Sequence, residues 1–277
     1  MGKLVGGDDG LPAEEVGDWI ADKHELLCDY VQISSATRRK YLSPIGKGGA
    51  AFIDLFCGPG RVQLKGSGAF VDGGCVAAWK KSVAGGAPFS KVIIGDVDED
   101  RLKAAGSRLS SLGAPVHALL GPASATADNA VANAADYGLN FVYLDPYSLG
   151  ALDFTIIAKL SKLRRIDILV HVSQMDLQRN FDRNAVARGS ALDTFAPEWR
   201  DSVDPMQAPK AARQAYFQYW RGIVAKLGVD TNTDMRLITG PDNQPLYLLL
   251  LAARHELAHT FWQAVAKKDD PQGALNF

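Results

Sequence analysis

Short apolar runs recur along the chain, and each is followed by a segment with helical periodicity. The runs are apolar on both faces, which is typical of parallel strands that helices cover on both sides. Regular alternation of such strands with helices predicts an open, doubly wound α/β sheet. We expect strands at residues 51–56, 91–96, 115–120, 140–145 and 166–173, and helices at 71–83, 99–112, 125–137 and 154–163.

Residues 174–228 interrupt this alternation. They include a predicted helix near 211–227, and we interpret them as an insertion over the open edge of the sheet. The chain then predicts an antiparallel hairpin, with strands at 235–239 and 246–252, and a final helix at 255–267. The expected fold is therefore α/β, with a doubly wound, mostly parallel seven-stranded sheet.

Residues 1–47 are predicted to form an N-terminal helical segment ahead of a domain at 48–277. The first 12 residues are expected to be flexible. Between residues 13 and 40, apolar side chains recur at three- and four-residue spacing, which predicts a helix. Lys23 and His24 of this helix could reach a site at the sheet edge, although a surface position is more typical of such side chains.

The composition does not indicate a particular class of binding partner. The 277 residues are 47% hydrophobic and carry a net charge of -1, whereas dedicated duplex binders are usually strongly basic. Cys28, Cys57 and Cys75 have no CxxC spacing, which argues against a disulfide framework and favours a reduced, cytoplasmic protein. No run approaches about 18 uncharged apolar residues, so no membrane span is expected. The N-terminus lacks the features of a secretion signal.

One segment predicts a ligand site at the end of the first strand. Asp54-Leu55-Phe56-Cys57-Gly58-Pro59-Gly60-Arg61 lies between a strand and a helix. Glycines at such a turn let the backbone approach a ligand closely, and a carboxylate there can accept a hydrogen bond from a ligand ammonium group. The segment matches neither GxGxxG nor a Walker pattern. Alone, it is also compatible with an ordinary tight turn.

Two further acids are expected at the same edge of the sheet, where open α/β sheets bind ligands. Asp96 ends the second strand and can accept the hydroxyls of a ribose, while Asp98 is the better candidate to cap the following helix. Asp145-Pro146-Tyr147 ends the fourth strand, where a carboxylate beside an aromatic ring can position an amino group. Phe56 follows Asp54 and Val97 follows Asp96, and both are expected to line the same ligand site.

With these motifs the sequence resembles class I S-adenosylmethionine (SAM)-dependent methyltransferases over about residues 48–265. The glycine segment looks like their first motif, Asp96 matches their ribose-binding acid, and Asp145-Pro146-Tyr147 looks like a shortened Asp-Pro-Pro-Tyr motif. A narrower resemblance, to the three-Cys-motif partner proteins, includes Trp19, Lys23-His24, the glycine segment and the closing Pro245-Leu246-Tyr247, His255 and Phe261-Trp262. It implies a methyltransferase-like fold, a bacterial or phage setting and association with a three-cysteine protein.

The resemblance implies a SAM-dependent methyltransferase whose acceptor is an amino group, with nucleic acid as the leading carrier. Two departures bear on this. One proline of the Asp-Pro-Pro-Tyr motif is missing, and no acid follows the third strand, so Ser124 or a backbone amide is expected at the adenine. Arg61 could contact the carboxylate of SAM or a substrate phosphate. Arg179 and Phe181 could contact a phosphate and stack on a base.

Two other functions stay open. The departures favour a non-catalytic SAM-binding module that serves a three-cysteine partner. His255-Glu256-Leu257-Ala258-His259 matches HExxH literally, and two histidines at i and i+4 of a helix can bind zinc. No third ligand is evident after His259, so the zinc hydrolase is the weaker alternative and no metal is assigned to the site.

Overall fold

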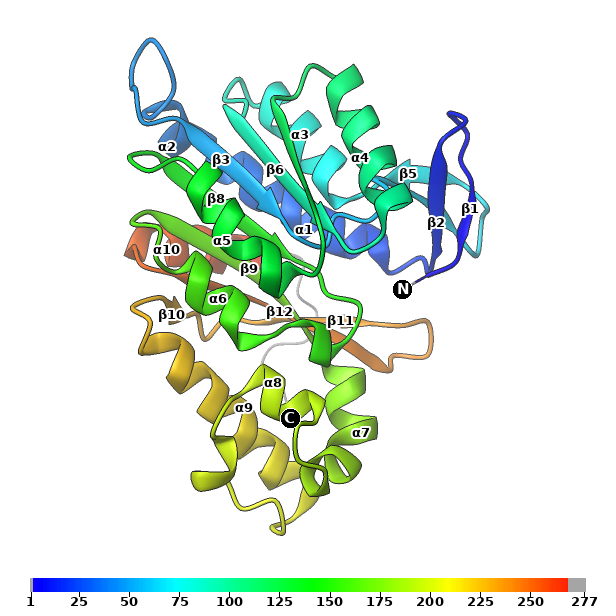
Figure 1. Ribbon diagram of the computed structural model, residues 1–277, viewed down its shortest axis with the longest axis vertical. Coiled ribbons are helices and arrows are strands. Elements are labelled where there is room, and N and C mark those ends of the chain that lie inside the picture. The colour runs from blue at the N-terminus through cyan, green and yellow to red at the C-terminus, as the bar shows by residue number, and fades with distance from the viewer. Residues whose placement is uncertain (1, 269–277) are drawn as a thin grey trace.

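The computed structural model describes residues 2–268, and its centre is a twisted eight-stranded sheet (Figure 1). The strand order is β10-β12-β9-β8-β3-β6-β7, and β11 also pairs with β12. The strands from β7 to β9 run parallel, whereas β12 is antiparallel to β9. The strands are β3 (Ala50–Asp54), β6 (Lys91–Asp96), β7 (Val116–Leu120), β8 (Leu139–Leu144), β9 (Ile166–Ser173), β10 (Asp230–Thr231), β11 (Arg236–Thr239) and β12 (Pro245–Ala253).

The doubly wound, mostly parallel sheet is thus confirmed, with one strand more than the seven expected. The additional strand is β10, a two-residue pairing with β12. So short a strand leaves no alternation of side chains in the sequence, which is why periodicity does not predict it. The predicted hairpin is confirmed as β11 and β12.

Helices cover both faces of the sheet. The expected helices are confirmed with small shifts, as α3 (Gly74–Ala84), α4 (Glu99–Ser111), α5 (Ala123–Asn133), α6 (Phe154–Leu160), α9 (Pro209–Ala225) and α10 (Glu256–Ala266). One core joins the sheet to α5, α6 and α9, and a second joins it to α1 (Ile20–Ile33), α3, α4 and α10. In β3, Ile53 faces the first core and Phe52 the second, as the two-residue period of a strand requires.

The prediction for the first 19 residues is wrong, whereas a helix between residues 13 and 40 is confirmed over a shorter range. Residues expected to be flexible or helical form β1 (Leu4–Gly6) and β2 (Pro12–Val16), and helix α1 begins only at Ile20. After α1 comes the short helix α2 (Ser35–Arg39). The predicted helix at 71–83 begins later because residues before it pair as β4 (Arg61–Leu64) and β5 (Phe70–Asp72). The four strands form a second sheet, in the order β1-β2-β4-β5.

Two arginines of α4 hold this second sheet against the domain. Arg108 is buried and forms a fork with both carboxylate oxygens of Asp9, at 2.6 and 2.7 Å. The same guanidinium donates to the carbonyl oxygens of Pro12 and Pro59, at 2.7 and 2.6 Å. Arg101 pairs with Glu14 at 2.6 Å. The small sheet therefore depends on contacts from residues about a hundred positions away in the chain.

The predicted insertion contains α7 (Gln174–Val186), α8 (Ala191–Phe195) and α9, which lie together below the sheet in Figure 1. Its interior is aromatic: Phe195 stacks on Trp220 with ring centroids 4.8 Å apart, and Trp199 meets Tyr216 edge-on at 5.2 Å. The boundaries 174–228 and the division of the chain at residue 47 stay predictions. Within residues 2–268, no helix is both long and apolar enough to cross a membrane.

A buried acid on β9 makes the stability of the fold depend on pH. The hydroxyl of Tyr30 in α1 donates to Asp167 at 2.9 Å. Burial raises the pKa of the Asp167 carboxyl to about 6, although this hydrogen bond opposes the rise. Because the folded state favours the protonated acid, the contribution of Asp167 to stability is full below the unfolded pKa and is lost as pH rises toward 6.

We therefore expect Asp167→Asn, which keeps an oxygen for Tyr30, to exceed the wild type in unfolding free energy above pH ~6, by up to about 3 kcal/mol. The two proteins should converge toward pH ~4. Urea denaturation at a series of pH values measures the difference. A gap that stays constant over this range would contradict the assignment.

Candidate active site

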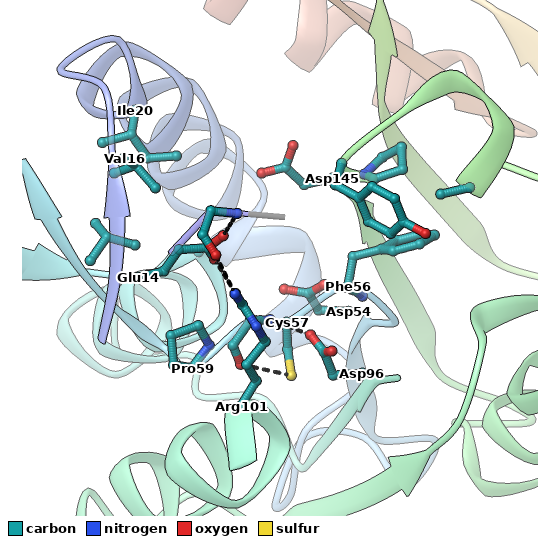
Figure 2. A pocket seen from close by; sticks show the side chains of 18 of the residues that line it. Glu14, Val16, Ile20, Asp54, Phe56, Cys57, Pro59, Asp96, Arg101 and Asp145 are labelled. Atoms are coloured by element: carbon teal, nitrogen blue, oxygen red, sulfur yellow. Dashed lines mark hydrogen bonds and ion pairs between the residues drawn. The ribbon is translucent and has the colours of Figure 1, made fainter. Parts of the chain in front are cut away.

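A cavity of about 540 Å³ opens at the carboxyl ends of β3, β6 and β8 (Figure 2). Asp54, Asp96 and Asp145 line it, as the sequence predicts. The strand register explains their meeting: Asp54 is level with Ile94 on β6 and Tyr143 on β8. Asp96 and Asp145 each lie two residues beyond that level, so the three acids surround one end of the sheet. The volume is in the range of small-molecule and cofactor sites.

The glycine turn borders this cavity. Gly58 and Gly60 have φ values of +56° and +76°, which L side chains rarely adopt. A Cβ on Gly60 would also lie 3.1 Å from Val76 Cγ2 and 3.2 Å from the Ala105 Cα, so the turn packs tightly on α3 and α4. Between the glycines and Asp54 lies Cys57, whose buried Sγ donates to the Gly58 carbonyl at 3.3 Å. Burial raises the pKa of this thiol well above its usual range.

Two of the acids also hold the backbone of the site. Asp96 accepts from the Gly58 amide at 3.0 Å and from the Asp98 amide at 2.9 Å, and Asp54 accepts from the Phe56 amide at 3.0 Å. Burial raises the pKa of both carboxyls, most strongly that of Asp54. Asp98 caps α4 through the amides of Asp100 and Arg101, which confirms the predicted division between a capping acid and a cavity acid.

Asp145 has a buried cationic partner. Lys23 Nζ lies 2.7 Å from each of its carboxylate oxygens, and the Lys23 side chain is only 4% exposed. Burial alone would raise the pKa of Asp145, but the Lys23 ammonium overrides it and holds the pKa at about 2. His171 Nδ1 is 3.5 Å from Asp145 Oδ1, and Lys23 Nζ lies 4.6 Å from the centroid of the Tyr247 ring. The acid predicted to position an amine is thus already bound on both oxygens.

The second sheet forms the opposite wall of the cavity. In Figure 2, Glu14 of β2 and Arg101 of α4 face the three acids across it. The Glu14 carboxylate also accepts from the Gly2 amide. Val16 and Trp19 continue this wall toward α1. Because Gly2, Glu14, Val16 and Trp19 come from the segment expected to be flexible or helical, this side of the site was not predicted from the sequence.

Most predicted site residues line the cavity: Asp54, Phe56, Gly58, Gly60, Asp96, Val97, Ser124, Asp145, Pro146 and Tyr147. The three residues predicted for substrate do not. Arg61 pairs with Asp8 and Asp72, and Arg179 is exposed on α7. Phe181 is 1% exposed and packs against Trp199 and Tyr216, so it cannot stack on a base. Its aromatic ring belongs to the core of the insertion.

Helix α1 and strand β12 also contribute site residues that the sequence did not predict. Lys23 is buried in the site rather than on the surface, and His24 is half-buried beside it. Burial, aided by Lys23, lowers the pKa of His24 to about 4. His171 and Tyr247 were not predicted as site residues. The block Lys23-His24 and the closing Tyr247, which carried the narrower family resemblance, were a signal for those three residues, whereas no motif pointed to His171 beside Asp145.

The HExxH segment does not have the geometry of a zinc helix. His255 lies before α10 and caps it, accepting from the Leu257 amide through Nδ1 at 3.1 Å. His259 Nε2 is 3.2 Å from the Ala253 carbonyl oxygen. The two histidines are therefore not on consecutive turns of one helix. No group of three or more metal-ligating side chains occurs within residues 2–268.

Comparisons with known proteins give likenesses in fold. No family model matches the sequence, and no curated protein does. Among solved structures, an O-methyltransferase from Bacillus cereus in complex with SAH has 13% identity and a TM-score of 0.47 over 88% of this chain and 85% of that one. The cofactor-bound protein Rv0187 from MTB has 14% identity and a TM-score of 0.44 over 85% and 81%. The expected doubly wound, mostly parallel α/β fold class is confirmed by the strand order itself, with β12 antiparallel to β9.

Arg108 connects the glycine turn to the second sheet, so its removal tests how the cavity wall is held. Arg108→Ala leaves the carbonyls of Pro12 and Pro59 without their donor and Asp9 without its partner. We expect a loss of about 2–4 kcal/mol in unfolding free energy, measured by chemical denaturation, and faster proteolysis of the first 16 residues.

Lys103→Ala on the same helix is the matched control, because its ion pair with Glu99 is 68% and 60% exposed on the two sides. It should lower the unfolding free energy far less than Arg108→Ala does, because an exposed ion pair contributes little to stability. Equal effects of the two substitutions would show that Arg108 is not the anchor.

Proposed function

We propose that this protein is a SAM-dependent methyltransferase. The observation that carries the proposal is the placement of the glycine turn and three acids from neighbouring strands around one cavity. The donor set fits the cofactor: carboxylates for hydroxyl and ammonium groups, a turn without side chains for close approach, and a volume of about 540 Å³. When bound, SAM supplies an electrophilic methyl group.

Each part of the cavity has a proposed partner in the cofactor. Asp96, at the end of β6, would accept hydrogen bonds from the ribose hydroxyls. Asp54 and the turn at Gly58 and Gly60 would hold the methionine end. Ser124, at the start of α5, would lie at the adenine, where Phe56 and Val97 supply apolar surface, as the composition of the cavity wall allows. The protein would contribute chiefly proximity and orientation.

We propose an amino group as the acceptor, with nucleic acid as its leading carrier. Pro146 and the exposed Tyr147 line the part of the cavity that we assign to the acceptor and call its acceptor end. Because Lys23 holds both oxygens of Asp145, an amine can reach that carboxylate only by displacing the ammonium. Otherwise the amine would have to use backbone carbonyls of the Asp145-Pro146-Tyr147 segment. Neither Arg61 nor Phe181 is available for the substrate, and Arg179 lies outside the cavity.

The same ion pair supports a second candidate, a non-catalytic SAM-binding module that serves a three-cysteine partner protein. An acid that is neutralised by Lys23 binds an acceptor amine poorly, as expected if the cavity serves only to bind the cofactor. A partner protein, a bacterial setting and a cytoplasmic location follow from the sequence resemblance and the reduced cysteines, and belong to this proposal.

Calorimetric titration of SAM and S-adenosylhomocysteine (SAH) tests the cofactor assignment. We expect micromolar binding of both, reduced roughly tenfold or more by Asp96→Ala, which removes the proposed ribose acceptor. Asp98→Ser is the control, because serine also caps helices and Asp98 does not line the cavity. Thermal melting of each variant shows whether the fold is kept.

Absence of binding by the folded wild type would overturn the proposal. Equal binding by the wild type and Asp96→Ala would overturn the ribose assignment. Binding without methyl transfer to RNA, DNA or protein pools would favour the non-catalytic module.

A further inference from the structure

The acceptor end of the cavity contains an ion pair, between Lys23 and Asp145, that is assigned no contact with the cofactor in the proposed function. Lys23 extends from α1, which covers one face of the sheet, to Asp145 at the end of β8. Its Nζ donates to both carboxylate oxygens of Asp145 at 2.7 Å. Its Nζ also lies over the Tyr247 ring, which fixes the ammonium between an acid and an aromatic face. Lys23 lines the cavity, so this charge borders the space that a ligand would fill.

The neighbouring groups leave Lys23 as the counter-charge of Asp145. Burial lowers the pKa of His171 to about 3 and that of His24 to about 4, so both rings are neutral near pH 7. The other cations that line the cavity have acids of their own: Arg101 pairs with Glu14 at 2.6 Å and Lys65 with Glu15 at 3.7 Å.

Asp145 and Asp54 belong to adjacent strands, which lie about 4.8 Å apart. Asp54 is the acid proposed for the methionine end of the cofactor, so the Lys23–Asp145 pair lies beside that end. A bare Asp145 carboxylate would attract a positive charge there, whereas the paired carboxylate presents almost none. SAM carries a positive sulfonium and SAH a neutral thioether, and the two are otherwise alike except for the methyl group.

We propose that Lys23 determines how the cavity discriminates between SAM and SAH. An unpaired Asp145 carboxylate would attract the positive sulfonium of SAM but not the neutral thioether of SAH. The Lys23 ammonium neutralises Asp145 and so removes this attraction. The pair therefore weakens the binding of the charged cofactor relative to its neutral product. This inference rests on the proposed function and assigns to Lys23 a specificity role, not a contact with the reacting atoms.

The test is the ratio of the Kd of SAH to the Kd of SAM, measured by calorimetry at pH 7.5 and low salt. Lys23→Met, which leaves Asp145 uncompensated, should raise this ratio roughly tenfold in favour of SAM. Asp145→Asn, which leaves Lys23 uncompensated, should shift it in the opposite direction. Lys23→Arg should stay within about twofold of the wild type, as should the double variant Lys23→Met/Asp145→Asn.

Lys80→Met is the matched control, since Lys80 forms a 2.8 Å pair with Asp72 that is half exposed and does not border the cavity. It should leave the ratio unchanged. If Lys23→Met does not fold, the opposite shift in Asp145→Asn and its reversal in the double variant still test the proposal.

Single variants that change both affinities equally would overturn the inference and leave the proposed function intact. A wild type that binds neither ligand would overturn both.

Discussion

The parallel pairing of β6, β3 and β8 is the constraint on which the site depends. Backbone hydrogen bonds fix Asp54 level with Ile94 and Tyr143, so the ends of three strands deliver their acids to one edge without any contact between the acids themselves. Three carboxylates brought together this way repel one another and lose hydration. The molecule offsets that cost locally, through the amides of Phe56, Gly58 and Asp98 and through the Lys23 ammonium.

A second arrangement closes the cavity from the opposite side. The sheet that contains β1 and β2 is small and cannot bury much of its own surface, so it depends on α4 for support. Arg108 binds the turn of the β1–β2 hairpin and the glycine turn with a single guanidinium, while Arg101 fixes Glu14. The second sheet and the glycine turn, which line opposite sides of the cavity, are therefore both held by side chains of α4.

The sequence was informative where local pattern decides structure. Apolar runs such as 91–96 and 166–173 predicted their strands, and the position of Asp98 before Glu99 and Asp100 predicted a cap. It failed where distant contacts decide. Pro12–Val16 has too few apolar residues to reveal a strand, and only one of its partners, β1, is local. The other partner strand, β4, and the Arg108 side chain lie far along the chain. Lysine is usually a surface residue, and only the fold brings Lys23 to its partner, Asp145. Phe181 beside arginines looked like a ligand contact, but the insertion requires it for packing.

The glycine turn has a chemical consequence through Cys57. A cavity that holds a methyl donor exposes its own nucleophiles to alkylation, and a thiolate is the strongest nucleophile among protein side chains. Burial and the neighbouring carboxylates keep the pKa of Cys57 high, and its Sγ is directed to the Gly58 carbonyl. Cys57 lines the cavity proposed for the cofactor, and its sulfur is held in the protonated form, which would protect the protein from modifying itself.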